Sequence, residues 1–172
     1  ADVIIESDLS LYELQDPPIG EAEKTIAQYA AEMVHDGDCI QLGFGGIPNA
    51  IGFELMNRHD LGIHTEQIGA SMAHMIQNGV VTNRYKNLDT GWSVGAFIIA
   101  DNFTYNYVNN HPRIMMRRGR YTNDPMIIAQ QDNMVSINAA LQIDLTGQVA
   151  AEAIGTVQWS GTGGATDYAY GA

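Results

Sequence analysis

Hydrophobic and polar positions change period along the chain, from short apolar runs to longer segments with helical spacing. The short runs are bounded by glycine, proline or charged residues, which is typical of buried strands. The longer segments carry apolar residues three or four positions apart, which is typical of amphipathic helices. This pattern predicts strands over 2–6, 39–43, 61–66 and 94–100, and helices over 21–35, 49–57, 72–78 and 103–110.

Strands that alternate with helices favour an α/β fold with an open, mostly parallel sheet flanked by helices. The proline-containing stretch 14–20 cannot lie inside a helix and is interpreted as a linker. A turn signal at Thr146 and Gly147 predicts hairpin-like strands within 134–155, an antiparallel addition near the C-terminal end. We therefore expect an interdomain or linker segment over 1–19 and a single domain over 20–172.

The first predicted helix carries its larger apolar side chains at helical spacing. We expect these positions to form its buried face, and they are Ile26, Tyr29, Ala30, Met33 and Val34.

Composition and charge narrow the classes of partner. The formal net charge is -12, which argues against nucleic acid and anionic membranes, because both bind basic surfaces. No run approaches the roughly 20 apolar residues of a membrane-spanning helix. The single cysteine, Cys39, excludes an internal disulfide and lies in an apolar run, so we expect a buried thiol, a reducing compartment and a cytoplasmic protein.

Four of the eight basic residues lie close together, between positions 113 and 120. In an acidic chain such a cluster either binds an anionic ligand or pairs with the protein's own carboxylates, and the sequence leaves both readings open. The cluster consists of Arg113, Arg117, Arg118 and Arg120.

Two glycine-rich loops follow apolar runs. "GFGGIP" at 43–48 contains Gly43, Gly45 and Gly46, and "SGTGG" at 160–164 contains Gly161, Gly163 and Gly164. Neither is followed by Gly-Lys-Ser/Thr, and "GFGGIP" lacks the third glycine of a dinucleotide-binding loop. The loops are suited either to tight turns or to presenting backbone N–H groups to a developing oxyanion.

Glu66 ends the predicted strand 61–66, at the sheet edge where ligands bind in open α/β folds. We expect the two glycine loops and this carboxylate to line one crevice. Glu66 could cap a helix or form an ion pair, and it could also attack an activated acyl group. His64 is expected to be a partly buried histidine with its hydrogen bonds satisfied, because no G-x-S-x-G elbow accompanies it. The spacing of the histidines does not match a metal site, so no metal is expected.

Six ordered motifs resemble the catalytic C-terminal domain of the coenzyme A transferases, in the branch of the 4-hydroxybutyrate, butyrate and acetate CoA-transferases and acetyl-CoA hydrolases. The resemblance extends from about residue 12 to 172. The motifs are "GFGGIPNA", "LGIHTE", "YTNDP", "DNMVSIN", "DLTGQV" and "SGTGG".

The resemblance implies a role for each motif. Glu66 matches the family's nucleophilic glutamate, and Gly45 and Gly46 match its oxyanion-stabilising loop. Asn123 of "YTNDP" matches an asparagine that contacts the reacting acyl group or carboxylate. Gly164 matches a donor to the oxyanion. The residues implied for coenzyme A are Gly43, Gly161, Gly163 and, for its phosphates, Arg117 and Arg118.

The implied activity is transfer of coenzyme A from an acyl-CoA to a short-chain carboxylate, such as acetate, butyrate or 4-hydroxybutyrate. The intermediates implied are an acyl-glutamyl anhydride and a glutamyl-CoA thioester. Coenzyme A is then a substrate, and the other expected partners are an N-terminal domain of the same enzyme and further copies in a homo-oligomer. An acyl-CoA hydrolase on the same scaffold and a non-catalytic CoA-binding fragment remain open as alternatives.

The chain departs from many relatives at three places. It has "GAS" at 69–71 in place of a polar segment, "MMRRGR" at 115–120, and Tyr170 in place of an arginine. The first difference is expected to remove polar contacts near Glu66, and the other two to alter acyl specificity or the binding of the phosphates of coenzyme A.

Overall fold

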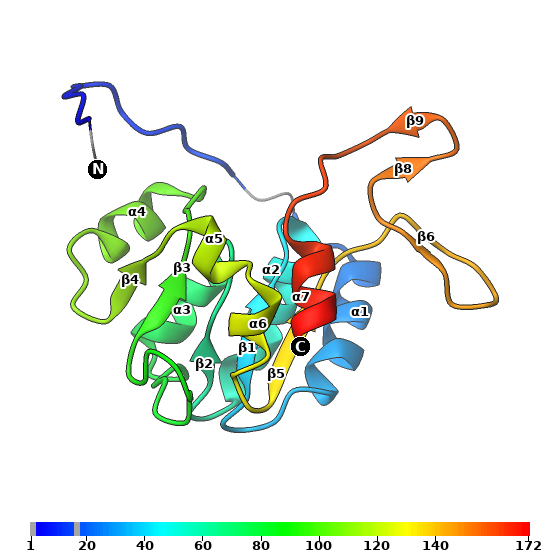
Figure 1. Cartoon of the computed structure of the whole chain (residues 1–172), viewed down its shortest axis with the longest axis horizontal. Coiled ribbons are helices and arrows are strands. Elements are labelled where there is room, and N and C mark those ends of the chain that lie inside the picture. The colour runs from blue at the N-terminus through cyan, green and yellow to red at the C-terminus, as the bar shows by residue number, and fades with distance from the viewer. Residues whose placement is uncertain (1–2, 16–17) are drawn as a thin grey trace.

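The computed structural model describes residues 3–15 and 18–172, and its centre is a parallel sheet (Figure 1). Strand β1 (Cys39–Leu42) lies between β2 (Gly62–Ile63) and β5 (Met134–Ile137), and both neighbours run parallel to it. Strands β3 (Ser93–Gly95) and β4 (Ile114–Met116) form a second parallel pair. The expected open, mostly parallel sheet is confirmed.

The two parallel sheets are continuous through isolated bridges. His64 pairs with Val94, and Gln67 pairs with Phe97, so the chain that follows β2 lies beside β3 and its extension. All four residues of β1 are buried, as expected of a parallel strand with helices on both faces.

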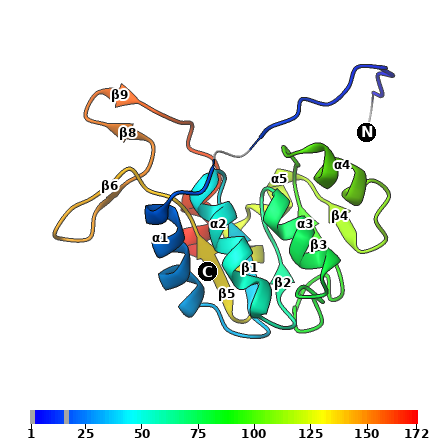
Figure 2. The same ribbon diagram turned by 180° about the vertical axis from the view of Figure 1, so that it is seen from behind.

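Helices cover both faces of this sheet. One face carries α1 (Glu21–Glu32), α2 (Gly46–Glu54) and α3 (Ala70–Gln77), as Figure 2 shows. The opposite face carries α5 (Gly119–Thr122), α6 (Pro125–Ile128) and α7 (Ala165–Gly171) (Figure 1). The 3-10 turn η1 (Leu55–Asn57) continues α2, and α4 (Asn102–Val108) packs on α3.

An antiparallel arm follows the parallel sheet and projects away from the helical layers (Figure 1). It contains two hairpins, β6 (Gln142–Ile143) with β7 (Val149–Ala150) and β8 (Ala153–Ile154) with β9 (Val157–Gln158). The predicted turn is confirmed, because Gly147 lies in the left-handed region between β6 and β7, with a φ of 87°.

Three predicted strands differ from the structure. Residues 3–6 form no strand, and residue 2 lies outside the described residues; Val3, Ile4 and Ile5 are exposed and have no neighbouring strand to pair with. Within 94–100 only Val94 and Gly95 belong to a regular strand, and Phe97 adds one isolated bridge to Gln67. Within 134–155, the first strand, β5, joins the parallel sheet and is no part of a hairpin.

Helix α1 forms as predicted, and Val34, just beyond its end, is buried as expected, but three of the larger residues predicted for its buried face are exposed. Ile26, Tyr29 and Met33 are exposed, at 45%, 67% and 67%, whereas Ala27 and Ala31 are buried. Small side chains allow α1 to lie close against α2, and these two helices make the most extensive helix–helix contact in the part of the chain that is described. Size complementarity at this interface therefore outweighs the hydrophobicity of the larger residues.

No helix in the described part of the chain is long and apolar enough to span a bilayer.

The close contact between α1 and α2 predicts that Ala27→Leu destabilises the protein. Ala27 has no exposed surface, so the added carbons must displace neighbouring atoms, at a cost of about 1–3 kcal/mol. Urea unfolding should report this loss. The matched control is Ala22→Leu on the exposed side of the same helix, and equal effects of the two changes would contradict the packing described.

Candidate active site

Glu66 lies three residues beyond the carboxyl end of β2, and backbone hydrogen bonds hold it there. Its carbonyl oxygen accepts hydrogen bonds from the N–H groups of Ala96 and Phe97, at 2.8 and 3.1 Å. The preceding residue, Thr65, donates its N–H to the carbonyl of Val94 at 3.0 Å. The half-buried side chain of Glu66 therefore starts from a fixed point on the sheet edge.

Two segments far away in sequence meet the carboxylate of Glu66. The N–H of Gly164 donates to its Oε2 at 3.0 Å. Gly164 is also close to the amide of Asn123, because a Cβ atom added at Gly164 would lie 2.5 Å from Asn123 Nδ2 and 2.7 Å from Glu66 Oε2. Only glycine leaves room for both side chains at this point. The three predicted catalytic residues Glu66, Asn123 and Gly164 are thus in one cluster.

A buried carbonyl beneath this cluster holds its parts together. The carbonyl oxygen of Thr122 accepts the Nε2–H of His64 at 3.0 Å and the hydroxyl of Tyr168 at 2.7 Å. These three residues have no exposed surface. The hydroxyl of Thr122 donates to Asn123 Oδ1 at 2.8 Å. The other end of this amide, Nδ2, therefore faces Gly164. The contacts link β2, α5 and α7 directly below the carboxylate.

His64 is neutral in this environment. A carbonyl oxygen can only accept, so the Nε2 of His64 carries the proton. Burial, and secondarily the charge of Lys86, lower the pKa of His64 to about 4. Its Nδ1 is buried and has no hydrogen-bond partner among the described residues. The expectation of a partly buried histidine with its hydrogen bonds satisfied holds only in part, because the ring is fully buried and one of its two nitrogens is bonded.

The carboxylate of Glu66 lines a cavity of about 420 Å³. The cavity also contacts the first glycine loop at Gly43 and Phe44, and the second over 160–164. The expected crevice between the two loops and Glu66 is therefore present. The chain after β5 and the arm also contribute to its walls, at Asn138, Ala139, Ala140, Leu141, Ala151, Glu152 and Trp159.

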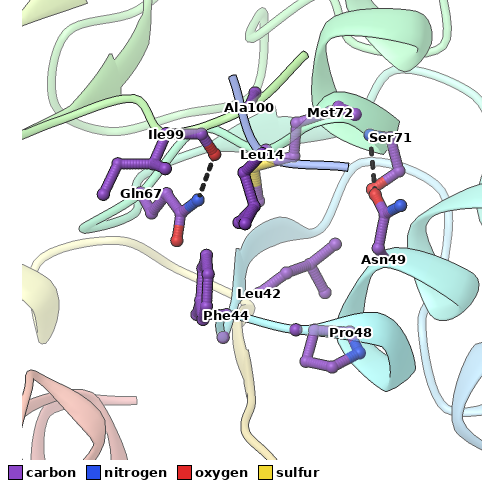
Figure 3. Close-up of a pocket in the computed structure, with 14 residues that line it drawn as sticks. Leu14, Leu42, Phe44, Pro48, Asn49, Gln67, Ser71, Met72, Ile99 and Ala100 are labelled. Carbon is purple, nitrogen blue, oxygen red and sulfur yellow. Dashed lines mark hydrogen bonds between the residues drawn. The ribbon is translucent and has the colours of Figure 1, made fainter. Parts of the chain in front are cut away.

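The glycines of the first loop serve different purposes. The N–H of Gly43 donates to the carbonyl of Ile137 at 2.8 Å, so it continues the pairing of β1 with β5. Gly45 has a φ of +116°, a conformation that L side chains rarely adopt, and it caps α2. Gly45 lines a smaller cavity of about 30 Å³ (Figure 3), and Gly46, the first residue of α2, lines another of about 350 Å³. Neither Gly45 nor Gly46 is among the described residues that line the 420 Å³ cavity beside Glu66.

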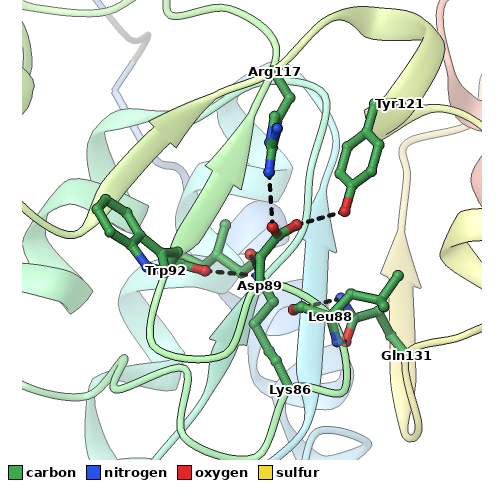
Figure 4. Close-up of polar contacts among 8 residues, drawn as sticks. Lys86, Leu88, Asp89, Trp92, Arg117, Tyr121 and Gln131 are labelled. Atoms are coloured by element: carbon green, nitrogen blue, oxygen red, sulfur yellow. Dashed lines mark hydrogen bonds and ion pairs between the residues drawn. The ribbon is translucent and has the colours of Figure 1, made fainter.

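Arg117 forms an ion pair within the chain. Its Nη2 lies 3.1 Å from Asp89 Oδ1, and its guanidinium lies over the ring of Tyr121, whose hydroxyl donates to the same carboxylate (Figure 4). Burial would raise the pKa of Asp89, but the hydrogen bonds from Tyr121 and Arg117 outweigh it and lower the pKa. Arg117 therefore pairs with one of the protein's own carboxylates, which is one of the two interpretations that the sequence left open. Neither it nor Arg118 is among the described residues that line the 420 Å³ cavity, and their binding to phosphate stays a prediction.

Several buried polar residues at the site were not predicted from the sequence. Gln41 in β1 donates to Asn138 Oδ1 at 3.0 Å and accepts from Ser136 and Asn138, which fixes the wall of the cavity after β5. A polar residue inside the apolar run "CIQLG" was a signal that could have revealed Gln41. Thr122 and Tyr168 had no such signal, because their roles depend on contacts between distant segments.

The site thus contains a half-buried carboxylate, a backbone donor, a side-chain amide and an adjoining cavity. Such a set can provide a nucleophile and donors for an oxyanion. Among the described residues, no three or more His, Cys, Asp or Glu side chains form a group that could hold a metal ion.

Comparisons with known proteins agree with this geometry. Residues 101–172 match the family described as the acetyl-CoA hydrolase/transferase C-terminal domain. The chain is 44% identical to the succinyl-CoA:cyclohexane-1-carboxylate CoA transferase of Geobacter metallireducens, over 99% of this chain and 39% of that protein. It is 42% identical to the 4-hydroxybutyrate coenzyme A transferase of Clostridium kluyveri, over 99% of this chain and 40% of that protein.

Comparison with solved structures points to the same family. RipA from Yersinia pestis superposes with a TM-score of 0.90 at 44% identity, covering 95% of this chain and 37% of that one. The sheet and its carboxyl-edge site therefore define a CoA-transferase-type α/β domain. The chain belongs to the acetyl-CoA hydrolase/transferase family, as its C-terminal CoA-transferase domain, and spans about 40% of the length of the relatives it matches.

The environment of His64 predicts how the protein responds to acid. The unfolded chain takes up a proton on this ring at about pH 6.5, whereas the folded protein does so only near pH 4. Since the unfolded state binds more protons between these values, this contribution to stability is complete above pH 6.5 and is lost as the pH falls to about 4. The loss amounts to roughly 3 kcal/mol.

NMR titration of the His64 ring measures this directly, with its signal assigned by its absence in His64→Gln. A midpoint near pH 6.5 in the folded protein would contradict the buried, neutral ring.

Proposed function

We propose that this chain is the catalytic part of an enzyme that transfers coenzyme A between an acyl-CoA and a small carboxylate, with Glu66 as the nucleophile. The observation that carries the proposal is the cluster of Glu66, Gly164 and Asn123 on the cavity of about 420 Å³. The names of the relatives support the reaction class.

In the proposed reaction, a carboxylate oxygen of Glu66 attacks the thioester carbonyl, and the tetrahedral intermediate expels the thiolate of coenzyme A. This leaves an acyl-glutamyl anhydride. The thiolate then attacks the glutamyl carbonyl and expels the first carboxylate, which leaves a glutamyl-CoA thioester. The incoming carboxylate attacks this thioester, and the same two steps in reverse deliver the new acyl-CoA. The thioester bond energy is retained because no step uses water.

Each tetrahedral intermediate carries a negative oxygen that needs preorganised donors. The N–H of Gly164 and the Nδ2 of Asn123 lie beside the carboxylate and are the donors we assign to this oxygen. Thr122 keeps Asn123 in the orientation that presents its N–H group, since the Thr122 hydroxyl donates to the amide oxygen. Gly45 and Gly46 stay candidates for a second set of donors from the first turn of α2.

The covalent intermediate gives the decisive experiment for this proposal. After incubation with acetyl-CoA, peptide mapping by mass spectrometry should find a CoA adduct on Glu66 that hydroxylamine removes. Glu66→Asp and Glu66→Ala should show neither adduct nor transfer from acetyl-CoA to butyrate, because the attacking carboxylate is moved or absent. Turnover in either variant would refute the assignment. Acetate release without transfer would instead favour the acyl-CoA hydrolase. Coenzyme A binding without any adduct would favour the non-catalytic fragment.

Gly164→Ala should affect transfer far more than stability. The added Cβ must displace Asn123 Nδ2 and Glu66 Oε2, which are the ends of side chains and can move aside without unfolding the core. Loss of one oxyanion donor typically costs about 10²–10³ in rate, and we expect a loss of this size in kcat. The control is Gly119→Ala, where a Cβ meets nothing within 4 Å. Equal kcat in both variants would contradict the role of Gly164.

A further inference from the structure

The amide of Asn123 depends for its position on α5, a helix of only four residues. Isolated helices of this length are not stable in water, because the first turn fixes many dihedral angles for few hydrogen bonds. The N-cap of α5, Arg118, adds no side-chain hydrogen bond. The bonds to the carbonyl of Thr122 hold only the end of α5, so contacts with another part of the chain must hold its start.

One carboxylate, that of Asp89, binds side chains from this segment (Figure 4). Its Oδ2 accepts the hydroxyl of Tyr121 at 2.7 Å, and its Oδ1 accepts Arg117 Nη2 at 3.1 Å. The guanidinium of Arg117 also lies 5.0 Å from the centre of the Tyr121 ring. The side chain of Asp89 is 10% exposed, so water competes little for these bonds. A residue before α5 and a residue within it are therefore tied to a single point.

Asp89 is itself fixed in the loop that precedes β3. Its carbonyl accepts the N–H of Trp92 at 2.9 Å. The neighbouring residue, Leu88, accepts the Nε2 of Gln131 at its carbonyl, at 3.2 Å, and donates its N–H to the Oε1 of the same side chain, at 3.4 Å (Figure 4). Gln131 is 4% exposed and follows α6. The carboxylate of Asp89 therefore provides a fixed reference point for α5.

The path from Asp89 to Asn123 is short. Tyr121 directly precedes Thr122, whose hydroxyl donates to Asn123 Oδ1 at 2.8 Å. The centre of the Tyr121 ring also lies 6.0 Å from that of His64, which binds the carbonyl of Thr122. A shift of Tyr121 therefore moves Thr122 and with it the Asn123 amide.

We propose that Asp89 is a positioning residue for CoA transfer, because it holds α5 where the amide of Asn123 reaches the developing oxyanion. This inference rests on the proposed function and adds a residue outside the site to it. Asp89 is not among the described residues that line the 420 Å³ cavity, so it acts through Asn123 and not on the substrate. It also gives Arg117 a role that differs from binding the phosphates of coenzyme A.

Asp89→Asn tests this role, because it keeps the shape of the side chain and removes its charge. Asparagine tolerates the left-handed backbone of this position, where φ is 50°. Its NH₂ group faces one of the two donors, so one of the two hydrogen bonds is lost. In transfer from acetyl-CoA to butyrate, we expect kcat of the folded protein to fall about tenfold, since a displacement of about 1 Å can cost about 10² in rate. KM for acetyl-CoA should stay the same, and a raised KM with unchanged kcat would overturn the inference.

A double-mutant cycle shows whether Asp89 acts through Asn123. Asn123→Ala removes the amide and should lower kcat by about 10²–10³. Adding Asp89→Asn to Asn123→Ala should then cost nothing further, because no amide is left to misplace. A general loss of structure would lower kcat by the same factor in both backgrounds, and that result would overturn the positioning role.

Asp60→Asn is the matched control. Asp60 likewise has a left-handed backbone, with a φ of 59°, accepts the hydroxyl of Thr82 at 2.9 Å and pairs with Arg84 at 3.1 Å. These contacts do not involve α5, so Asp60→Asn should leave kcat unchanged. An equal loss of kcat in Asp60→Asn and Asp89→Asn would contradict the inference.

The side-chain amide signals of Asn123 in NMR spectra separate failure of this inference from failure of the proposed function. These signals, assigned by their absence in Asn123→Ala, should shift in Asp89→Asn and not in Asp60→Asn. Unshifted signals in Asp89→Asn would overturn the inference and leave the transferase intact. If the unaltered protein shows no transfer, the proposed function fails, and the same signals still decide whether Asp89 positions Asn123.

Discussion

The site depends on one buried carbonyl oxygen, that of Thr122. It accepts hydrogen bonds from His64, next to the end of β2, and from Tyr168, within α7. These contacts join three segments that come from different parts of the chain. Without them, Gly164 at the start of α7 and Asn123 at the end of α5 would have no reason to meet Glu66. The position of the carboxylate is therefore a property of the buried layer beneath it, and a neutral His64 is a condition for that layer.

The parallel sheet explains why the site lies where it does. In such a sheet the carboxyl ends of the strands share one edge, and the chain leaves each strand there in a loop. The glycine loop after β1, Glu66 after β2 and the segment after β5 all leave at this edge, and the chain returns through the arm to α7. The cavity is bounded by these exits. The arm itself exposes Ile143, Leu145 and Val157, so part of the cavity wall belongs to a segment with little packing of its own.

Much of the architecture could be predicted from the periodicity of the sequence, because burial of parallel strands between helices produces distinct apolar runs. The glycine loops and Glu66 were also predictable, since strand ends meet at one edge. The burial of Ala27 and Ala31 on α1 could not be predicted, because alanine has little hydrophobicity and is present here for its small size. Helices α5 and α6, of four residues each, are too short to show a period. Thr122, Tyr168 and Asp89 could not be identified either, since their importance arises from which distant atoms they face, and local pattern carries no information about that.

The buried Lys86 has a chemical consequence for a protein proposed to handle acyl thioesters. Its amine donates to the carbonyls of Ile63 and Trp92, at 2.9 and 2.7 Å, and burial lowers its pKa to about 8 (Figure 4). A lysine with a lowered pKa is more often uncharged near neutral pH, and an uncharged amine attacks thioesters. Such a group near a bound acyl-CoA would acylate itself. Because its protons are donated to both carbonyls and only 5% of the residue is exposed, the Lys86 amine is kept from attacking an acyl thioester.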